Sequence, residues 1–311
     1  LLEKRIHRNL KESKKIIFSE IYILSSYRPL FSFKNLIKFF LKIENPVIKN
    51  QVLNFVSEEK IIKKIKTLLP IENTISLNVK NQYEEYPYPR WDIFQKNTNN
   101  IKYYDYINLE TSDRTKPKKV KKILVAGCGT GRHAISISMI DPSVKIDAID
   151  LSKKSLAYAY RKSEELNIKN INWIHGDILD LESLRKRYDV IESVGVLHHM
   201  ESPKKGLSVL SKILEARGLL KLGLYSRTYR NKLKPAKKFL ADNNYSRNLK
   251  SIQEARRQII KSKEDNIKYP SIYMSDFYTT SAFVDLLIHE QELDFNIDDL
   301  VDLYKKEFNF L

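Results

Sequence analysis

The chain has 311 residues and a formal net charge of +17, from 55 Lys/Arg against 38 Asp/Glu. That length is enough for an α/β catalytic domain with an appended region. Its single cysteine, Cys128, excludes an internal disulfide framework. No Cys/His group has the spacing of a zinc site, so we expect no metal centre.

Residues 1–75 are predicted to form an N-terminal helical region, because apolar residues such as Ile17, Ile21 and Leu24 recur at helical spacing among lysines. The longest apolar stretch here, residues 16–43, is interrupted by Ser, Arg, Pro and Lys. It is too broken to cross a membrane. No secretory signal pattern is found either, so we expect a cytoplasmic protein with no membrane partner.

Residues 76–120 are predicted to be a lid or linker segment ahead of the core. They contain a dense cluster of polar and aromatic side chains, Tyr86, Tyr88, Arg90 and Trp91, which two prolines stiffen. We expect these four side chains to cover a ligand pocket. The alternative is that the aromatic rings anchor the N-terminal helices to the core.

Residues 121–226 are predicted to alternate between strands and helices. The apolar run at residues 123–126 predicts a buried strand that leads into three glycines, Gly127, Gly129 and Gly131. Glycines at these positions let the backbone turn sharply and approach a ligand closely. A helix is expected directly afterwards, with its N-terminal amides facing the loop.

Asp150 ends a second apolar strand, 19 residues after Gly131. An acidic residue there can accept hydrogen bonds from both hydroxyls of a ribose. A dinucleotide fingerprint would need a glycine at position 132, and this chain has Arg132. The sequence therefore favours a nucleoside-containing cofactor other than a nicotinamide dinucleotide.

The glycine pattern, followed by a larger residue, resembles motif I of the class I S-adenosylmethionine-dependent methyltransferases. Residues 173–178 and 218–224 resemble the third and fifth strands of that family, and residues 188–200 resemble its motif IV. The resemblance implies a Rossmann-like α/β fold and S-adenosyl-L-methionine as cofactor, with Asp177 bound to the adenine amino group. The cofactor-binding residues that it implies are Gly127, Gly129, Gly131, Asp150, Leu151, Asp177, Ile178 and Ser193.

Two further segments are similar to a narrower group, the bacterial methyltransferases that often carry tetratricopeptide repeats. Residues 81–91 resemble their "QYEENPYPRW" segment, and residues 281–292 resemble their "DLLFHVQEH" segment. Asp285 and His289 in the second segment lie four residues apart, so they share a helix face and are candidates to line an acceptor pocket. The alternative is an ordinary packed or surface pair.

His198 and His199 follow the predicted fourth strand and are the candidate catalytic residues. The carboxyl ends of the strands are where open α/β sheets bind ligands. Histidine titrates near neutral pH and suits a general base. The alternative is that one ring packs against the cofactor and the other caps the next helix.

Residues 227–311 are predicted to be a helical insert that contributes to substrate binding. Residues 227–268 carry 13 Lys/Arg against 4 Asp/Glu, whereas residues 269–311 carry 2 against 9. A full fold of this family closes with a β-hairpin. We expect this hairpin to be truncated here and the chain to be incomplete.

The methyl acceptor is left open by the sequence. A basic surface can attract nucleic acid, but the [DNS]-P-P-[YFW] motif that holds a flipped base is absent. We therefore do not favour a nucleic-acid partner. An O, N or C acceptor on a small molecule or a protein remains, and the alternative function is a non-catalytic binding module with a basic interaction surface.

Overall fold

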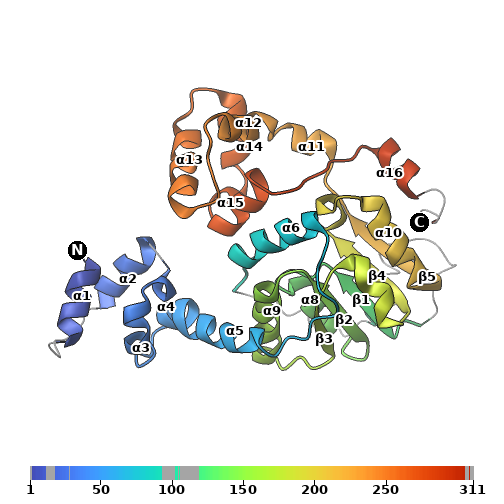
Figure 1. The fold of residues 1–311 in the computed structure, drawn as a ribbon, viewed down its shortest axis with the longest axis horizontal. Coiled ribbons are helices and arrows are strands. Elements are labelled where there is room, and N and C mark those ends of the chain that lie inside the picture. The colour runs from blue at the N-terminus through green and yellow to red at the C-terminus, as the bar shows by residue number, and fades with distance from the viewer. Residues whose placement is uncertain are drawn as a thin grey trace. The chain divides into compact units, whose positions relative to one another are not determined.

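Figure 1 shows the computed structural model of the chain. The chain divides into two compact units, within each of which the contacts are dense. One unit spans Leu1–Lys64 and the other spans Ile65–Leu311. Much of the predicted linker falls outside the described residues. The structure describes residues 2–11, 18–27, 29–92, 102–103, 105, 119–304 and 308.

The first unit is helical, as its apolar spacing predicted. Its helices pack around a cluster that includes Ile21, Phe40 and Val52. Asn45 caps one of them by accepting a hydrogen bond from the Val47 amide at 2.9 Å. The elements are α1 (Leu2–Lys11), α2 (Phe18–Tyr27), η1 (Leu30–Ser32), η2 (Lys34–Leu36), α3 (Ile37–Phe40), α4 (Pro46–Ile48), η3 (Lys49–Leu53) and α5 (Asn54–Ile62).

The second unit contains a parallel sheet of five strands in the order β3-β2-β1-β4-β5. This is the Rossmann-like α/β class that the sequence predicted. The strands are β1 (Lys122–Ala126), β2 (Lys145–Asp150), β3 (Ile171–His175), β4 (Tyr188–Val194) and β5 (Leu214–Gly223). Helices and 3-10 turns connect them: α8 (Arg132–Ile140), α9 (Lys153–Glu165), η4 (Ile178–Leu184), η5 (Leu197–His199) and α10 (Pro203–Lys212).

Side chains alternate across the sheet and build a separate core on each face. Ile123 and Val125 of β1 pack in one cluster with residues of α8 and α9. Leu124 and Ala126 pack in another with residues of η4 and α10. The continuous apolar run at residues 123–126 is explained by this burial on both faces.

The fifth strand differs from its prediction. The sequence predicted this strand at residues 218–224, whereas β5 already starts at Leu214. The register shifts between the pairs Tyr188–Leu214 and Val190–Leu219. Arg217 adopts a φ of +66° there. The irregularity is thus a bulge inside the strand, which keeps the ladder with β4 on both sides of it.

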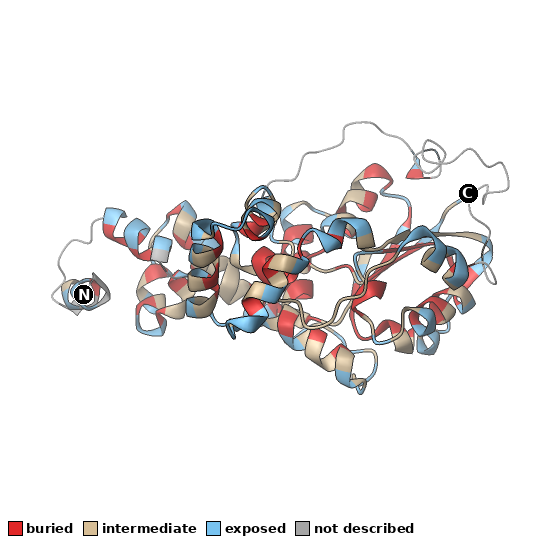
Figure 2. Cartoon of the chain, turned by 90° about the horizontal axis from the view of Figure 1, so that it is seen from above, coloured by how far each residue is buried: buried red, intermediate tan, exposed pale blue. Residues whose placement is uncertain are grey.

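The C-terminal helices form a third cluster, as predicted for the insert. They surround side chains such as Leu240, Ile259 and Phe283. In Figure 2 buried and exposed residues alternate around these helices, as expected for amphipathic packing. The elements are α11 (Arg227–Asn231), α12 (Lys234–Asp242), α13 (Leu249–Lys261), α14 (Asp265–Ile272), η6 (Ser275–Phe277), α15 (Thr280–Leu287) and α16 (Ile297–Tyr304).

Helix α6 (Thr74–Glu85) precedes the sheet and carries the start of residues 81–91, which we call the tyrosine–proline segment. It packs against α9, and Figure 1 shows it between the sheet and the C-terminal helices. Within the described residues, none of the helices combines the length and the apolar character that crossing a membrane requires.

Candidate functional site

A cavity of about 1190 Å³ opens at the carboxyl ends of the parallel strands. It is larger than the roughly 300–1,000 Å³ typical of a site for one small ligand, so it has room for two partners. Its walls come from the glycine loop, α6, the tyrosine–proline segment and the C-terminal helices. The predicted site residues that line it are Gly127, Gly129, Asp150, Leu151, Asp177, Ile178, Tyr88, His199 and Asp285.

The glycine loop is held against the second strand and covered by the tyrosine–proline segment. The amides of Gly127 and Cys128 both donate to the Ile149 carbonyl at 2.9 Å. At Gly129, where φ is +51°, an added Cβ would lie 2.9 Å from the Tyr88 carbonyl oxygen. Only glycine therefore allows the covering segment to approach this closely.

Gly131 lies outside the cavity lining and serves packing instead. Its φ is +79°, and an added Cβ would lie 2.4 Å from the Ala159 Cβ and 2.7 Å from the Trp173 ring. The missing side chain lets α8 begin directly against α9 and β3. The third glycine thus supports the loop from behind, at a distance from any ligand in the cavity.

Asp150 is the best-positioned polar group in the cofactor part of the cavity. One carboxylate oxygen accepts a hydrogen bond from the Gly129 amide at 2.7 Å, and the other accepts one from the Ser152 amide at 2.9 Å. Burial raises the pKa of this carboxyl to about 6, although both amides favour its charged form. Each oxygen keeps a further lone pair with which it can accept a hydrogen bond from a ligand.

Asp177 and Ile178 follow β3 and line the same cavity. Asp177 is buried, and one of its carboxylate oxygens accepts a hydrogen bond from the Leu179 amide at 3.0 Å, which starts η4. Leu151 and Gly176 line the cavity as well. The three segments after β1, β2 and β3 thus meet around one space.

Ser193 and His198 are not part of the cavity lining. Both are fully buried, and neither the Ser193 hydroxyl nor the ring nitrogens of His198 have a hydrogen-bond partner among the described residues. The His198 ring stacks on Tyr225 with centroids 3.6 Å apart. Burial lowers the pKa of His198 to about 2, so the ring is neutral and acts in packing.

His199, by contrast, lines the cavity. Its Nδ1 lies 2.7 Å from the Gln291 carbonyl oxygen, to which it donates a hydrogen bond. In the neutral ring that tautomer leaves a lone pair on Nε2. Burial lowers the pKa of His199 to about 4, which keeps the lone pair available at neutral pH.

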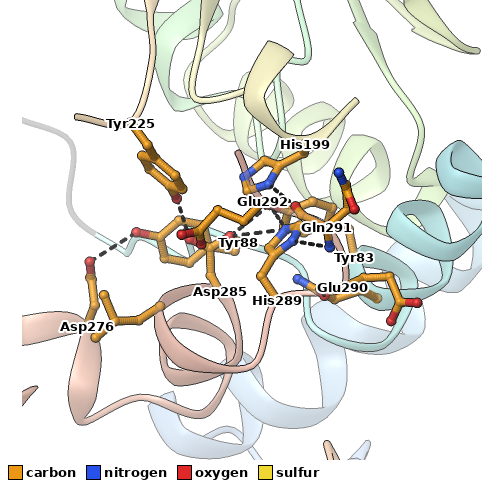
Figure 3. A network of polar contacts seen from close by, with 12 residues as sticks. Tyr83, Tyr88, His199, Tyr225, Asp276, Asp285, His289, Glu290, Gln291 and Glu292 are labelled. Atoms are coloured by element: carbon orange, nitrogen blue, oxygen red, sulfur yellow. Dashed lines mark hydrogen bonds and ion pairs between the residues drawn. The ribbon is translucent and has the colours of Figure 1, made fainter. Parts of the chain in front are cut away.

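His199 belongs to a polar network that joins the two segments of the narrower resemblance (Figure 3). The Tyr83 hydroxyl lies 2.7 Å from an Asp285 carboxylate oxygen and 3.0 Å from His289 Nε2. The His289 ring stacks on His199 with centroids 3.7 Å apart. The Tyr225 hydroxyl donates to the other Asp285 oxygen at 3.3 Å. Burial raises the pKa of Asp285 to about 6.

The partners in this network determine which atom donates and which accepts in each of its hydrogen bonds. The Gln291 amide donates to His289 Nδ1 at 3.1 Å, so Nε2 carries the proton of the neutral ring. His289 Nε2 therefore donates to the Tyr83 oxygen, and the Tyr83 hydroxyl is free to donate to Asp285. The chain of donors ends at the Asp285 carboxylate.

The same residues come close to a metal-binding arrangement. One ligand atom each from His199, Asp285 and His289 lie within 4.8 Å of one another. The sequence predicted no metal because no Cys/His group has the spacing of a zinc site, and His199 lies 86 positions before Asp285. A metal on His289 Nε2 would need the lone pair that the Gln291 amide's bond to Nδ1 excludes in the neutral ring. The hydrogen-bonded arrangement is therefore the better description of this cluster.

The four predicted lid residues take different positions. Tyr88 lines the cavity, and its hydroxyl lies 3.4 Å from an Asp276 carboxylate oxygen. The Tyr86 hydroxyl donates to the Arg247 carbonyl, and its ring packs on the insert cluster. The Trp91 indole donates to the Thr130 carbonyl at 3.2 Å. The Arg90 guanidinium lies 5.4 Å from the centre of the Tyr158 ring.

The polar cavity residues that sequence reasoning missed include Tyr83, Tyr225, Asp276 and Arg230. Tyr83 lies inside the segment already singled out, and Tyr225 follows the fifth strand, so their positions held a usable signal. Arg230 and Asp276 come from the insert, where nothing in the local pattern distinguishes them from surface residues.

The comparison with known families agrees with this architecture. The profile of a family described as a methyltransferase domain matches residues 117–274, about half of the chain. The chain belongs to this family, and its fold is that of the class I S-adenosylmethionine-dependent methyltransferases. S-adenosylmethionine is accordingly its cofactor.

The individual proteins that match this chain have low sequence identity to it. An uncharacterized Synechococcus protein is 27% identical over 58% of this chain and 45% of its own length. Malonyl-[acyl-carrier protein] O-methyltransferase from Halalkalibacterium halodurans is 32% identical over 36% of this chain and 42% of its own length. The chain thus spans less than half of either relative. PKMT2 from Rickettsia typhi has a similar structure, with a TM-score of 0.54 and 17% identity over 70% of this chain and 44% of that one.

Proposed function

We propose that this chain transfers the methyl group of S-adenosylmethionine to an O, N or C acceptor on a small molecule or protein. The observation that carries the proposal is that one continuous cavity joins the glycine loop and Asp150 to the His199–Asp285 network. A structure of Rickettsia typhi PKMT2 in complex with AdoHcy shares this fold at a TM-score of 0.50 and 18% identity, over 60% of this chain and 39% of that one.

The cofactor part of the cavity fits the group that the family uses. Asp150 offers two carboxylate oxygens that can accept hydrogen bonds from a ribose diol, and its own backbone partners orient them. Gly127 and Gly129, which have no side chains, line the same cavity. Asp177, Ile178 and Leu151 supply a carboxylate and two apolar side chains for the adenine.

The other half of the cavity would hold the acceptor next to His199. When bound, S-adenosylmethionine supplies an electrophilic methyl group, whose transfer to a lone pair breaks the carbon–sulfur bond. His199 presents an unprotonated Nε2 because Gln291 fixes its tautomer. An imidazolium formed there would lie close to the Asp285 carboxylate, which would stabilise the charge. We assign His199 the role of general base on these grounds.

The Tyr83–Pro89 stretch covers the reacting region. Tyr88 places its carbonyl over Gly129 and its ring in the cavity. Closing the site excludes water and holds both partners in position. The cytoplasmic location expected from the sequence stays a prediction.

Transfer of tritiated methyl from S-adenosylmethionine to acceptors in a cell lysate tests the proposal. The adjacent histidines provide a matched pair of variants. We expect His199→Gln to lower turnover by about 10²–10⁴-fold. His198→Phe should keep most of the activity, because an aromatic ring can preserve the stack on Tyr225. Equal losses in both variants, with cofactor affinity retained, would refute the assignment of His199 as the base.

A further inference from the structure

The part of the cavity beyond the glycine loop is acidic and rich in tyrosine. We define this acceptor lobe by Tyr83, Tyr88, Tyr225, Asp276 and Asp285, all of which line the cavity. Figure 3 shows the tyrosine hydroxyls directed at the two carboxylates. The Asp285 side chain is only 9% exposed, so its charge acts in a poorly solvated environment.

One arginine also lines this lobe, and its hydrogen bonds are already used. Arg230 Nε donates to the Glu292 carboxylate at 2.7 Å, and Nη2 donates to the same carboxylate. Nη2 also contacts the Leu286 carbonyl oxygen at 3.5 Å, and the guanidinium lies 3.9 Å from the centre of the Tyr225 ring. Lys237 donates to Glu292 as well, at 2.7 Å.

Because Arg230 and Lys237 are paired with Glu292, a molecule bound in the acceptor lobe meets a net negative charge. The Arg230 edge formed by Nε and Nη2 cannot also bind a carboxylate of the acceptor in the bidentate manner that arginine favours. Arg132, the other arginine in the lining, begins α8 on the glycine-loop side. An acidic acceptor would therefore face Asp276 and Asp285 without a free arginine fork in the described part of the lobe.

We propose that the methyl acceptor is an amine that is protonated in solution, bound by Asp285 and Asp276 among the rings of Tyr83, Tyr88 and Tyr225. The inference rests on the proposed methyltransferase function and narrows it from O, N or C acceptors to nitrogen. Carboxylates bind ammonium groups by charge-assisted hydrogen bonds. Tyrosine rings add cation–π attraction, which strengthens when the cation is desolvated.

The chemistry of an ammonium acceptor also gives His199 a defined task. An ammonium has no lone pair, so it must first lose a proton, which His199 Nε2 can accept. The neutral nitrogen then forms a bond to the methyl carbon while the carbon–sulfur bond breaks, and its electron pair passes to sulfur. One sulfonium and one ammonium are converted into a thioether, a methylated ammonium and a proton released to solvent.

Binding to the protein saturated with S-adenosylhomocysteine tests this inference without turnover. The probes are n-butylammonium, n-butanol and butyrate, which share a chain length and differ in charge. Isothermal titration should show the ammonium binding about tenfold or more tightly than either of the others. Equal affinities for the three probes, or tighter binding of butyrate, would overturn the inference.

Two variants connect the preference to the acidic lobe. Asp285→Asn should reduce the ammonium preference about tenfold while S-adenosylhomocysteine still binds. Asp276→Asn, at a partly exposed position, should reduce it less and leaves the buried network intact. An unchanged preference in both variants would contradict the role of these carboxylates. If the parent protein does not bind S-adenosylhomocysteine, the proposed function itself is overturned.

The labelled product gives a second, independent answer. A methyl group on nitrogen withstands alkali, whereas a methyl ester releases methanol. Stable label that chromatographs as an N-methylated amine after acid hydrolysis supports the inference. Label released by alkali, or found in a methyl ether, would show an oxygen acceptor and leave the methyltransferase assignment standing.

Discussion

Replacing Gly131 with alanine should destabilise the second unit strongly, although this glycine does not line the cavity. A residue with a side chain costs about 1–2 kcal/mol in the left-handed conformation that Gly131 adopts. The new Cβ would also overlap the Ala159 Cβ at 2.4 Å and the Trp173 ring at 2.7 Å. Overpacking of this kind costs about 1–3 kcal/mol, so the free energy of unfolding should fall by about 2–5 kcal/mol.

Gly195 provides the matched control because its φ of +78° is nearly the same, yet an added Cβ would meet nothing within 4 Å. Gly195→Ala should therefore lower the free energy of unfolding by only about 1–2 kcal/mol. Urea denaturation followed by tryptophan fluorescence measures both, because Trp91 and Trp173 lie in the core of this unit. Equal losses in the two variants would refute the packing role that we assign to Gly131.

Three further predictions follow from the ionisable and covering residues. Cofactor affinity should fall about tenfold between pH 7 and pH 5, because Asp150 loses its charge as the pH drops through about 6; calorimetry at several pH values checks this, and a flat profile would contradict it. Burial and nearby Lys153 lower the pKa of His175 to about 4, so stability should decrease by up to about 3 kcal/mol from pH 6.5 to pH 4, as protons bind preferentially to the unfolded state. Urea denaturation should show a flatter pH profile for His175→Gln. Tyr88→Ala should reduce turnover and leave the melting temperature nearly unchanged, and the opposite pattern would assign Tyr88 a purely structural role.

The sheet and its glycine loop could be predicted because their signals are local. The apolar run at residues 123–126 leads directly into the glycine loop, and Asp150 ends the next strand, 19 residues after Gly131. The position of a strand in the sheet then determines which residues reach the cavity. The fifth strand was less well predicted, because its bulge reflects pairing with β4 and leaves no clear mark in the local sequence.

The acceptor side of the cavity depends on contacts between residues that are far apart in the sequence. Tyr83 and Asp285 are separated by 202 positions, and only the packing of the C-terminal helices brings them together. The two neighbouring histidines show a second limit of prediction from the sequence. His198 and His199 occupy one 3-10 turn, where successive side chains point in different directions, so only one can face the cavity. The sequence cannot tell which of them does.

Calorimetric titration of S-adenosylmethionine into the parent protein and into Asp150→Ala tests the central claim most directly. The account predicts saturable binding of one molecule per chain. It also predicts affinity lower by about 5–150-fold in the variant, the equivalent of about 1–3 kcal/mol for the lost hydrogen bonds to the ribose. The absence of binding to the parent would contradict the methyltransferase assignment, and equal affinities would contradict the site that we describe.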